Sequence, residues 1–250
     1  MKKILVPSLI ALALGSVSGL AQAQAAAAPE SSLSFNVGAT TDYRYRGISQ
    51  SRLKPALQGG VDYADKSGFY VGAWGSTIKW IKDSGASKGT TEVDLYGGYK
   101  GAMGDVSYDV GVLRYQYLGN TLGDVTGFAN ANTTEVYGAV TYNVFTAKYS
   151  HALTNTFGNV NSKNSYYLDL SATFDLGNGF TLTPHVGRQM INNTPLASYN
   201  DYSLTLGKDL GNGLSASAMA VGTNADTGPY TLAGKYNGKD ALVVGLKYAF

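Results

Sequence analysis

Apolar and polar residues alternate with a period of two along most of the chain from residue 33 onward. Such alternation is typical of a β-strand that has one apolar and one polar face. In the first segment, Leu33, Phe35 and Val37 alternate with Ser34 and Asn36. The clear segments are residues 33–40, 57–63, 92–99, 106–112, 135–142, 145–150, 167–174, 180–186, 201–206 and 242–250.

Two further segments are less regular. Residues 69–75 can be read with either face outward, and residues 214–220 offer mostly alanine on the apolar side. Counting both segments gives about twelve strands, an even number that would place both chain ends on the periplasmic side of a barrel. After the N-terminal segment, no apolar run approaches the roughly 18 residues that would indicate a membrane-spanning helix.

The connections between these segments alternate in length. In an up-and-down transmembrane barrel, short turns face the periplasm and longer loops face outward. Two of the short turns contain Gly-Asn-Gly, whose residues readily take the positive φ angles of tight hairpins. The short turns are residues 64–68, 101–104, the surroundings of Asn143, 177–179 and 211–213; the longer polar stretches are residues 41–55, 76–90, 118–133, 152–165, 189–198 and 223–240.

The distribution of charge separates a membrane barrel from a water-soluble β-sandwich, which also predicts alternation. In the clear segments the charged residues fall on the polar face only, as with Asp62, Glu92 and Asp169. A charge on the lipid face costs roughly 2–4 kcal/mol at the bilayer midplane, so this segregation has a physical cause. We therefore expect an all-β fold, a transmembrane antiparallel up-and-down barrel formed by residues 33–250.

The first 23 residues have the order of a secretory signal peptide. Lys2 and Lys3 precede an apolar stretch over residues 4–14, and small residues follow up to Ala23. The stretch is shorter than the roughly 20 apolar residues of a membrane anchor. We expect cleavage after Ala23, a short tail over residues 24–32, and export to the bacterial outer membrane.

Composition narrows the chemistry. Charged residues make up 14% of the chain, against roughly 25% in soluble domains. The 19 basic and 17 acidic side chains nearly balance, so no nucleic-acid partner is expected. With no cysteine and two histidines, we expect no disulfide, no metal site and no cofactor. Six tyrosines lie near the ends of apolar faces, where they suit the membrane interfaces: Tyr63, Tyr99, Tyr142, Tyr149, Tyr202 and Tyr248.

The last segment carries a candidate assembly signal. Val244, Leu246, Tyr248 and Phe250 share its apolar face. This arrangement resembles the C-terminal strand that outer-membrane barrels present to the barrel-assembly machinery, a pairing event at a sheet edge. We therefore expect that machinery and outer-membrane lipid as partners.

Three stretches carry a family resemblance: residues 35–49, 68–75 and 92–99. With them, the chain resembles the TorF-type porin family of proteobacteria, conserved outer-membrane proteins of unknown function. The resemblance implies an outer-membrane location and channel activity. It brings no substrate and no binding residues.

The polar faces supply the candidate pore lining. A barrel of this size has a narrow lumen, wide enough for ions or small solutes that diffuse passively. We expect facing rows of opposite charge to select among them, and arginines that continue the inward parity of the first strand to line the outer entrance. The candidates are Asp42, Arg44, Arg46, Asp62, Glu92, Asp94, Asp109, Arg114, Glu135, Lys148, Asp169, His185, Arg188 and Lys247.

Two other functions remain as alternatives. One is a non-conducting structural or adhesion barrel, in which Ile78, Trp80 and Ile81 form either a contact patch or an extension of a strand above the membrane. The other, least favoured, is an outer-membrane lipid hydrolase that uses Ser150 and His151. Neighbouring strand residues point to opposite faces, so these two side chains are poorly placed to cooperate and no enzyme is expected.

Overall fold

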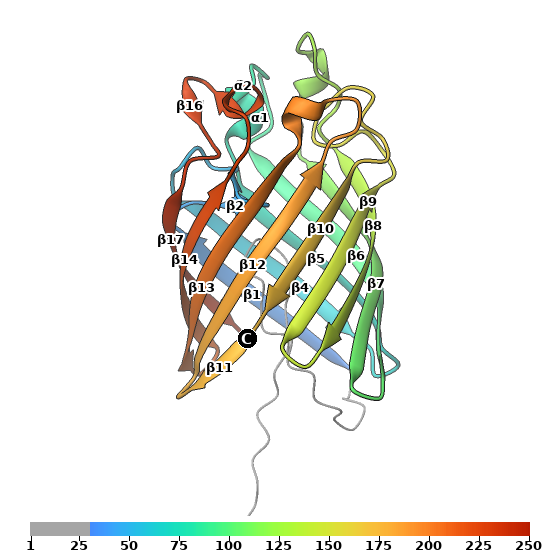
Figure 1. Ribbon diagram of the computed structural model, residues 1–250, viewed down its shortest axis with the longest axis vertical. Helices are drawn as coiled ribbons and strands as arrows, with labels where there is room; N and C mark the ends of the chain where they lie inside the picture. Colours follow the sequence, from blue (N-terminus) through green and yellow to red (C-terminus); the bar gives the residue numbers. More distant parts are fainter. Residues whose placement is uncertain (1–30) are drawn as a thin grey trace, which may run out of the picture.

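The computed structural model describes residues 31–250, which form a closed antiparallel β-barrel (Figure 1). The wall consists of twelve strands, because β10 and β11 flank Thr173 and together make one of them. The strands are β1 (Ser32–Thr40), β4 (Ala56–Ala64), β5 (Phe69–Thr77), β6 (Thr91–Met103), β7 (Val106–Tyr117), β8 (Thr133–Tyr142), β9 (Phe145–Ala152), β10 (Tyr166–Ala172), β11 (Phe174–Gly177), β12 (Phe180–Met190), β13 (Tyr199–Gly211), β14 (Leu214–Thr223) and β17 (Ala241–Ala249).

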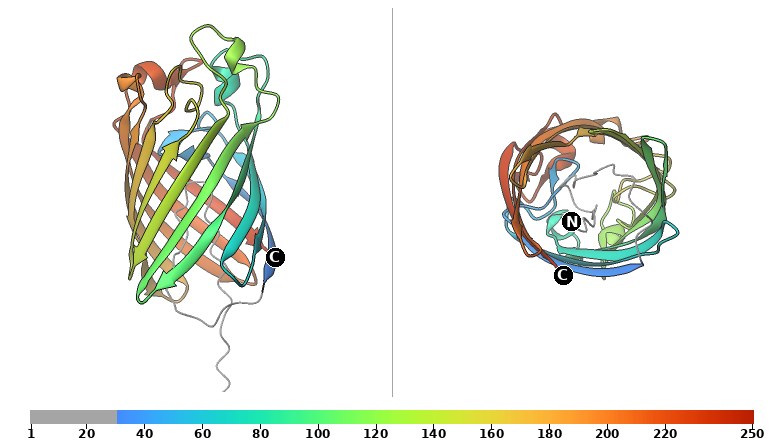
Figure 2. Two further views of the ribbon diagram at one scale, coloured as in Figure 1. Left: turned by 90° about the vertical axis from the view of Figure 1, so that its right-hand side faces the viewer. Right: turned by 90° about the horizontal axis from the view of Figure 1, so that it is seen from below.

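The barrel closes by pairing its first strand with its last. β1 and β17 pair from Asn36↔Ala249 to Thr40↔Gly245, and every other neighbouring pair is also antiparallel. Seen from below, the strands form a complete ring (Figure 2). The expected all-β barrel is therefore confirmed. The expected signal peptide lies outside the described residues.

The outer surface of the wall is apolar, as a transmembrane barrel requires. Leu57, Val110 and Leu242, on different strands, are 49–70% exposed on this face. The ambiguous segment 69–75 is also resolved, since Val71 pairs with outward Tyr63. In β14 the alternating alanines face outward, while Met219 faces the interior with Val221 and Val243.

The short turns have the backbone that their sequences predict. Asn178 and Asn212 take φ angles of 52°, and the glycines on both sides of each also have positive φ. Asn143 has a φ of 54°. Because asparagine and glycine tolerate this left-handed region, these sites close tight hairpins at one end of the barrel.

The longer connections gather at the other end (Figure 1). Among residues 31–250, no helix is long and apolar enough to cross a membrane. The short elements in these loops are the hairpin of β2 (Arg44–Tyr45) and β3 (Ile48–Ser49), α1 (Trp80–Asp83), η1 (Leu122–Asp124), η2 (Pro195–Ala197), α2 (Thr227–Tyr230), and the hairpin of β15 (Thr231–Leu232) and β16 (Lys235–Tyr236).

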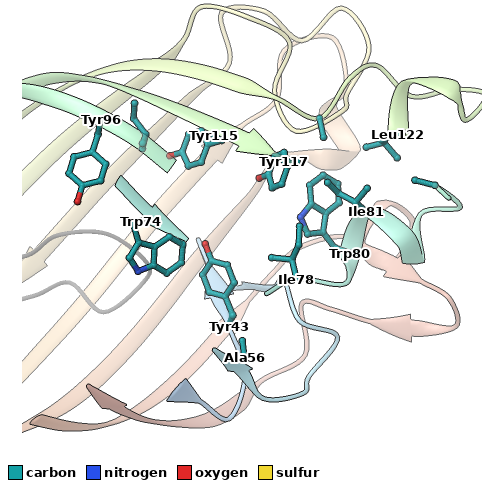
Figure 3. Packing of buried hydrophobic residues seen from close by; sticks show 13 residues of the cluster. Tyr43, Ala56, Trp74, Ile78, Trp80, Ile81, Tyr96, Tyr115, Tyr117 and Leu122 are labelled. Carbon is teal, nitrogen blue, oxygen red and sulfur yellow. The ribbon is translucent and has the colours of Figure 1, made fainter. Parts of the chain in front are cut away.

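The largest buried apolar cluster joins the inner wall to the outer loops (Figure 3). Trp80 and Ile81 of α1 are 9% and 0% exposed, and the Trp80 ring meets Tyr117 of β7 edge to face at 5.3 Å. Ile78, which follows β5, is 2% exposed. The contact-patch interpretation of these three residues is therefore wrong, because they pack inward and tie the loops to the wall.

Candidate functional site: the lumen wall and its entrance loop

The loop after β1, residues 41–55, folds into the barrel; we call it the entrance loop. Its β2–β3 hairpin turns at Arg46 and Gly47, whose φ angles are 48° and 77°. A Cβ added at Gly47 would collide with Thr223 and Asp201 of the wall. The turn therefore needs glycine for its backbone angle and for close contact with β13 and β14.

The base of the hairpin is held by Asp42. Its carboxylate accepts a hydrogen bond from Arg44 Nε at 2.6 Å and others from Ser49 Oγ at 2.5 Å and Ser51 Oγ at 3.1 Å. Arg44 also donates to the carbonyl oxygen of Gly47 at 2.8 Å. All of these side chains are buried, so the loop is a packed structure and not a solvated strand extension.

Arg46, at the tip of the hairpin, connects it to two distant strands of the wall. Its guanidinium binds both carboxylate oxygens of Glu135 on β8, at 3.1 and 2.7 Å, and donates to Gln189 Oε1 on β12 at 2.6 Å. Four wall strands separate β1 from β8 in one direction, and three separate it from β12 in the other. The hairpin thus bridges the outer end of the lumen.

Aromatic rings surround this ion pair. The Arg46 guanidinium lies 4.3 Å from the ring centre of Tyr167 and 4.8 Å from that of Tyr45. Tyr115 donates to Glu135 at 3.2 Å. Removing one partner of such a buried ion pair destabilises the folded protein by about 3–5 kcal/mol, because the other charge stays buried without a partner. Arg46 and Glu135 therefore hold the hairpin across the lumen.

Below the hairpin, the lumen wall carries basic and acidic side chains along one hydrogen-bonded row, which ends with two acidic residues. Lys100 pairs in register with Asp109, and Lys148 pairs with Asp169. The row continues from Asp169 through Gly187 to Asp201. We call Lys100, Asp109, Lys148, Asp169 and Asp201 the charged row.

Tyrosines and a histidine connect this row. Tyr70 donates to Asp109 at 2.6 Å, while Lys148 lies 4.2 Å above the ring of Tyr137. His185 Nε2 lies 3.0 Å from Asp169 Oδ2, and its Nδ1 lies 3.7 Å from Asp201 Oδ1. The inner wall therefore carries a connected set of charged and hydrogen-bonding side chains.

Most of the expected lining residues do face the interior. Lys247 and Asp62 follow the inward parity of their strands, and Asp62 accepts a hydrogen bond from Tyr96. Glu92 and Asp94 also lie on the inner side, but at 1% and 2% exposed they are buried and do not line open space. The residues on the inner side are Asp42, Arg44, Arg46, Asp62, Glu92, Asp94, Asp109, Glu135, Lys148, Asp169, His185 and Lys247.

Two expected lining residues are on the wrong face. Arg114 pairs with outward Leu95 and donates to Thr134 at 2.9 Å, while its neighbour Leu113 is the inward, buried residue. Arg188 pairs with outward Leu168. Both arginines lie near the outer ends of their strands, where the outer face no longer meets the bilayer core and charge is tolerated.

The expected facing rows of opposite charge are also absent from the described wall. Acidic and basic residues are instead direct neighbours, as in Lys148↔Asp169. The entrance loop covers the acidic residues near the outer end, since Tyr43 donates to Glu92 at 3.4 Å. The charges that stay at least partly exposed are therefore Lys100, Asp109, Lys148 and Asp169 of the charged row, together with Asp62, His185 and Lys247, whereas Asp201 is 3% exposed.

Sequence reasoning missed four residues of this arrangement. Lys100 and Asp201 continue the inward parity of their strands and were visible on that basis. Tyr167 and Gln189 have the same inward parity, but their contacts with Asp201 and Arg46 join distant parts of the chain and gave no sequence signal.

Ser150 and His151 do not form a catalytic pair. Ser150 is 4% exposed and follows the inward parity of β9. The His151 ring lies on the other face and stacks on Tyr149 at 6.2 Å.

A protein family described as "Bacterial protein of unknown function (Gcw_chp)" matches residues 23–250, so the chain belongs to this family. Among solved structures, it is similar to the KdgM porin, with a TM-score of 0.56, 8% identity, and coverage of 87% of this chain and 99% of that one. The KdgM porin in complex with disordered oligogalacturonate has a TM-score of 0.55 and 8% identity, with coverage of 88% of this chain and 99% of that one. The NanC porin has a TM-score of 0.55 and 10% identity, with coverage of 88% of this chain and 99% of that one. No curated protein matches the chain.

Proposed function

We propose that this member of the Gcw_chp family is a bacterial outer-membrane channel of the TorF type, through which ions or small solutes diffuse passively. The observation that carries the proposal is the charged row inside a barrel whose outer face is apolar. Partly exposed charges on the inner wall of a barrel are what sets ion preference in a water-filled pore. The shared fold of the KdgM and NanC porins supports the same function.

The proposed location and assembly follow from the same surface. The exposed apolar band needs hydrocarbon as its solvent, and closed barrels of this kind span membranes because no strand edge is left unpaired. The expected signal peptide over residues 1–23 would export the chain. Outer-membrane lipid and the barrel-assembly machinery are accordingly the proposed partners.

The entrance loop would act as the filter. The Arg46 hairpin narrows the outer end of the lumen, so a solute has to pass beside it before it meets the charged row. Because the row holds two lysines and three aspartates, its charges nearly balance, and we expect a weak preference between cations and anions.

A closed structural barrel is the second candidate, and the hairpin itself favours it. A barrel whose lumen is closed would also have an ion pair such as Arg46–Glu135 across its lumen and a buried apolar cluster beside it. Planar-bilayer recording decides between the two. Refolded protein without residues 1–23 should give discrete current steps in KCl. A folded, heat-modifiable barrel that gives no steps would overturn the channel proposal.

A further inference from the structure

The outside of the barrel has a pocket at the outer ends of β5 and β6. Its volume is about 470 Å³, within the ~300–1,000 Å³ of small-molecule sites. Thr77 of β5 and Thr91 of β6 belong to its lining and pair with each other in register. Both have the outward parity of the exposed residues Val71 and Leu95 on the same strands. The pocket therefore opens on the outer face of the wall and not into the lumen.

Exposed leucines lie on both sides of this threonine pair. Thr77 Oγ1 accepts a hydrogen bond from Leu57 N of β4 at 3.2 Å, and Leu118 N, just after β7, donates to Thr91 O at 3.0 Å. Leu57 is 68% exposed and Leu118 is 50% exposed. All four strands begin or end at this level. The pocket thus lies at the outer edge of the lipid-facing band, where lipid headgroups replace hydrocarbon.

The charge of the pocket is positive. Its lining contains Arg52 of the entrance loop, Lys79 and Lys82 at α1, and one acidic residue among those described, Asp83. Arg52 Nη1 lies 3.4 Å from Asp83 Oδ1, so these two charges compensate each other. Lys79 and Lys82 are exposed and form no ion pair within residues 31–250. Two positive charges of the pocket are therefore left without an acidic partner.

The other polar groups of the lining are hydroxyls. Thr77 Oγ1 already accepts a hydrogen bond from Leu57 N, so its O–H remains free to donate. Thr90 and Thr91 bring two more hydroxyl groups. A lysine ammonium offers three donors and no acceptor. Such a set of donors matches a phosphate group, whose charged oxygens only accept and form strong hydrogen bonds with cationic donors.

We propose that this pocket binds the phosphate group of an anionic lipid in the outer leaflet, with the acyl chains lying on the apolar wall below; this site rests on the proposed outer-membrane location. Basic clusters at a membrane surface attract anionic lipids. A soluble anion would use the lysines but not the flanking Leu57 and Leu118. An uncharged lipid would cover the leucines but leave both lysines without a counter-charge.

The test is native mass spectrometry of the refolded barrel without residues 1–23, in a neutral detergent with EDTA, titrated with diphosphoryl lipid A. Binding should be saturable and at least about tenfold tighter than that of the fully dephosphorylated lipid, because the phosphate faces two uncompensated lysines. Equal affinity for the dephosphorylated lipid overturns the proposal. Inorganic phosphate that binds as tightly as lipid A also overturns it, since the lipid chains would then contribute nothing.

Two double variants locate the site. Lys79→Gln with Lys82→Gln removes the uncompensated charges from exposed positions, and heat modifiability shows that the barrel is folded. Each basic side chain at an anionic membrane surface contributes a factor of about five in affinity, so this variant should bind lipid A roughly 25-fold more weakly. The matched control is Lys163→Gln with Lys239→Gln, two exposed lysines of other outer loops that do not line the pocket.

The control should bind lipid A as the parent does. Equal weakening in both double variants would show that net charge alone attracts the lipid, and unchanged binding in the pocket variant would show that the lysines do not hold it. Either result overturns the assignment.

The site and the channel fail separately. A barrel that gives current steps but does not retain phosphorylated lipid overturns only the lipid site. A barrel that retains phosphorylated lipid but gives no current steps keeps the site and overturns the channel.

Discussion

Phe35 and Phe250 join the first and last strands of the barrel. Phe35 N donates to Phe250 O at 2.8 Å, and Phe250 N donates to Phe35 O at 3.0 Å. Their rings stack with centroids 5.8 Å apart on the outer face, and Tyr248 stacks on Phe250 at 5.5 Å. The seam that closes the wall is thus marked by three aromatic rings.

Phe250→Ala should lower the yield of assembled barrel. The backbone pairing can remain, but the stacked rings at the closing seam, worth about 0.5–1.5 kcal/mol per pair, are lost. The measurement is the fraction of heat-modifiable protein in isolated membranes. Phe69→Ala is the matched control, because Phe69 is equally exposed and pairs with Tyr99 away from the seam. Equal yields from both variants would count against an assembly role for Phe250.

Arg46→Gly should increase the single-channel conductance and its open-state noise. Glycine accepts the left-handed turn, so the variant removes the contacts with Glu135 and Gln189 without straining the hairpin. The buried Glu135 then loses its partner, which releases the hairpin. Arg52→Gly is the control, since Arg52 has a φ of 63° in the same loop and bridges Asp83. Identical currents from parent and Arg46→Gly would show that the hairpin does not limit conduction.

Neutralising the charged row should shift ion preference in opposite directions. Lys148→Gln should raise cation preference and Asp109→Asn should raise anion preference, each by roughly twofold in permeability ratio, because removing a positive charge makes the wall potential more negative and removing a negative charge makes it more positive. Reversal potentials in a KCl gradient measure this ratio. Arg188→Gln removes a charge from the outer face and should leave the ratio unchanged. A shift from Arg188→Gln as large as the others would refute the assignment of faces.

The turn at Asp65 should resist acid. Hydrogen bonds from Ser67, the side-chain hydroxyl first, lower the pKa of the Asp65 carboxyl from 3.8 to about 2. A pKa lowered by folding means that the carboxylate stabilises the turn above pH 3.8 and loses this effect as pH falls through about 2. NMR titration of the Asp65 carboxyl should show it. Ser67→Ala should raise the midpoint, while Ser67→Thr should keep it low; a midpoint unmoved in Ser67→Ala would contradict the cause.

Local patterns were sufficient for the wall. The period of two assigned faces correctly for Asp62 and Asp169, because strand geometry alternates sides regardless of what lies around it. The Asn-Gly turns at Asn178 and Asn212 were equally local, since they depend on φ angles that few residues adopt. Arg114 and Arg188 share the outward parity of Val112 and Val186, so the period placed them correctly too; the assignment of both charges to the interior was wrong, because the outer face is no longer required to be apolar where each strand leaves the bilayer.

By itself, then, the sequence determined a closed barrel, its lipid face and its tight turns. The tertiary structure alone decided what fills the outer end. The Arg46 bridge to Glu135 joins residues 89 positions apart, and no local period encodes such a contact. The basic pocket beside Thr77 and Thr91 likewise exists only because Arg52 of the entrance loop meets α1 once the strands have paired. Both depend on register and docking, which are properties of the whole chain.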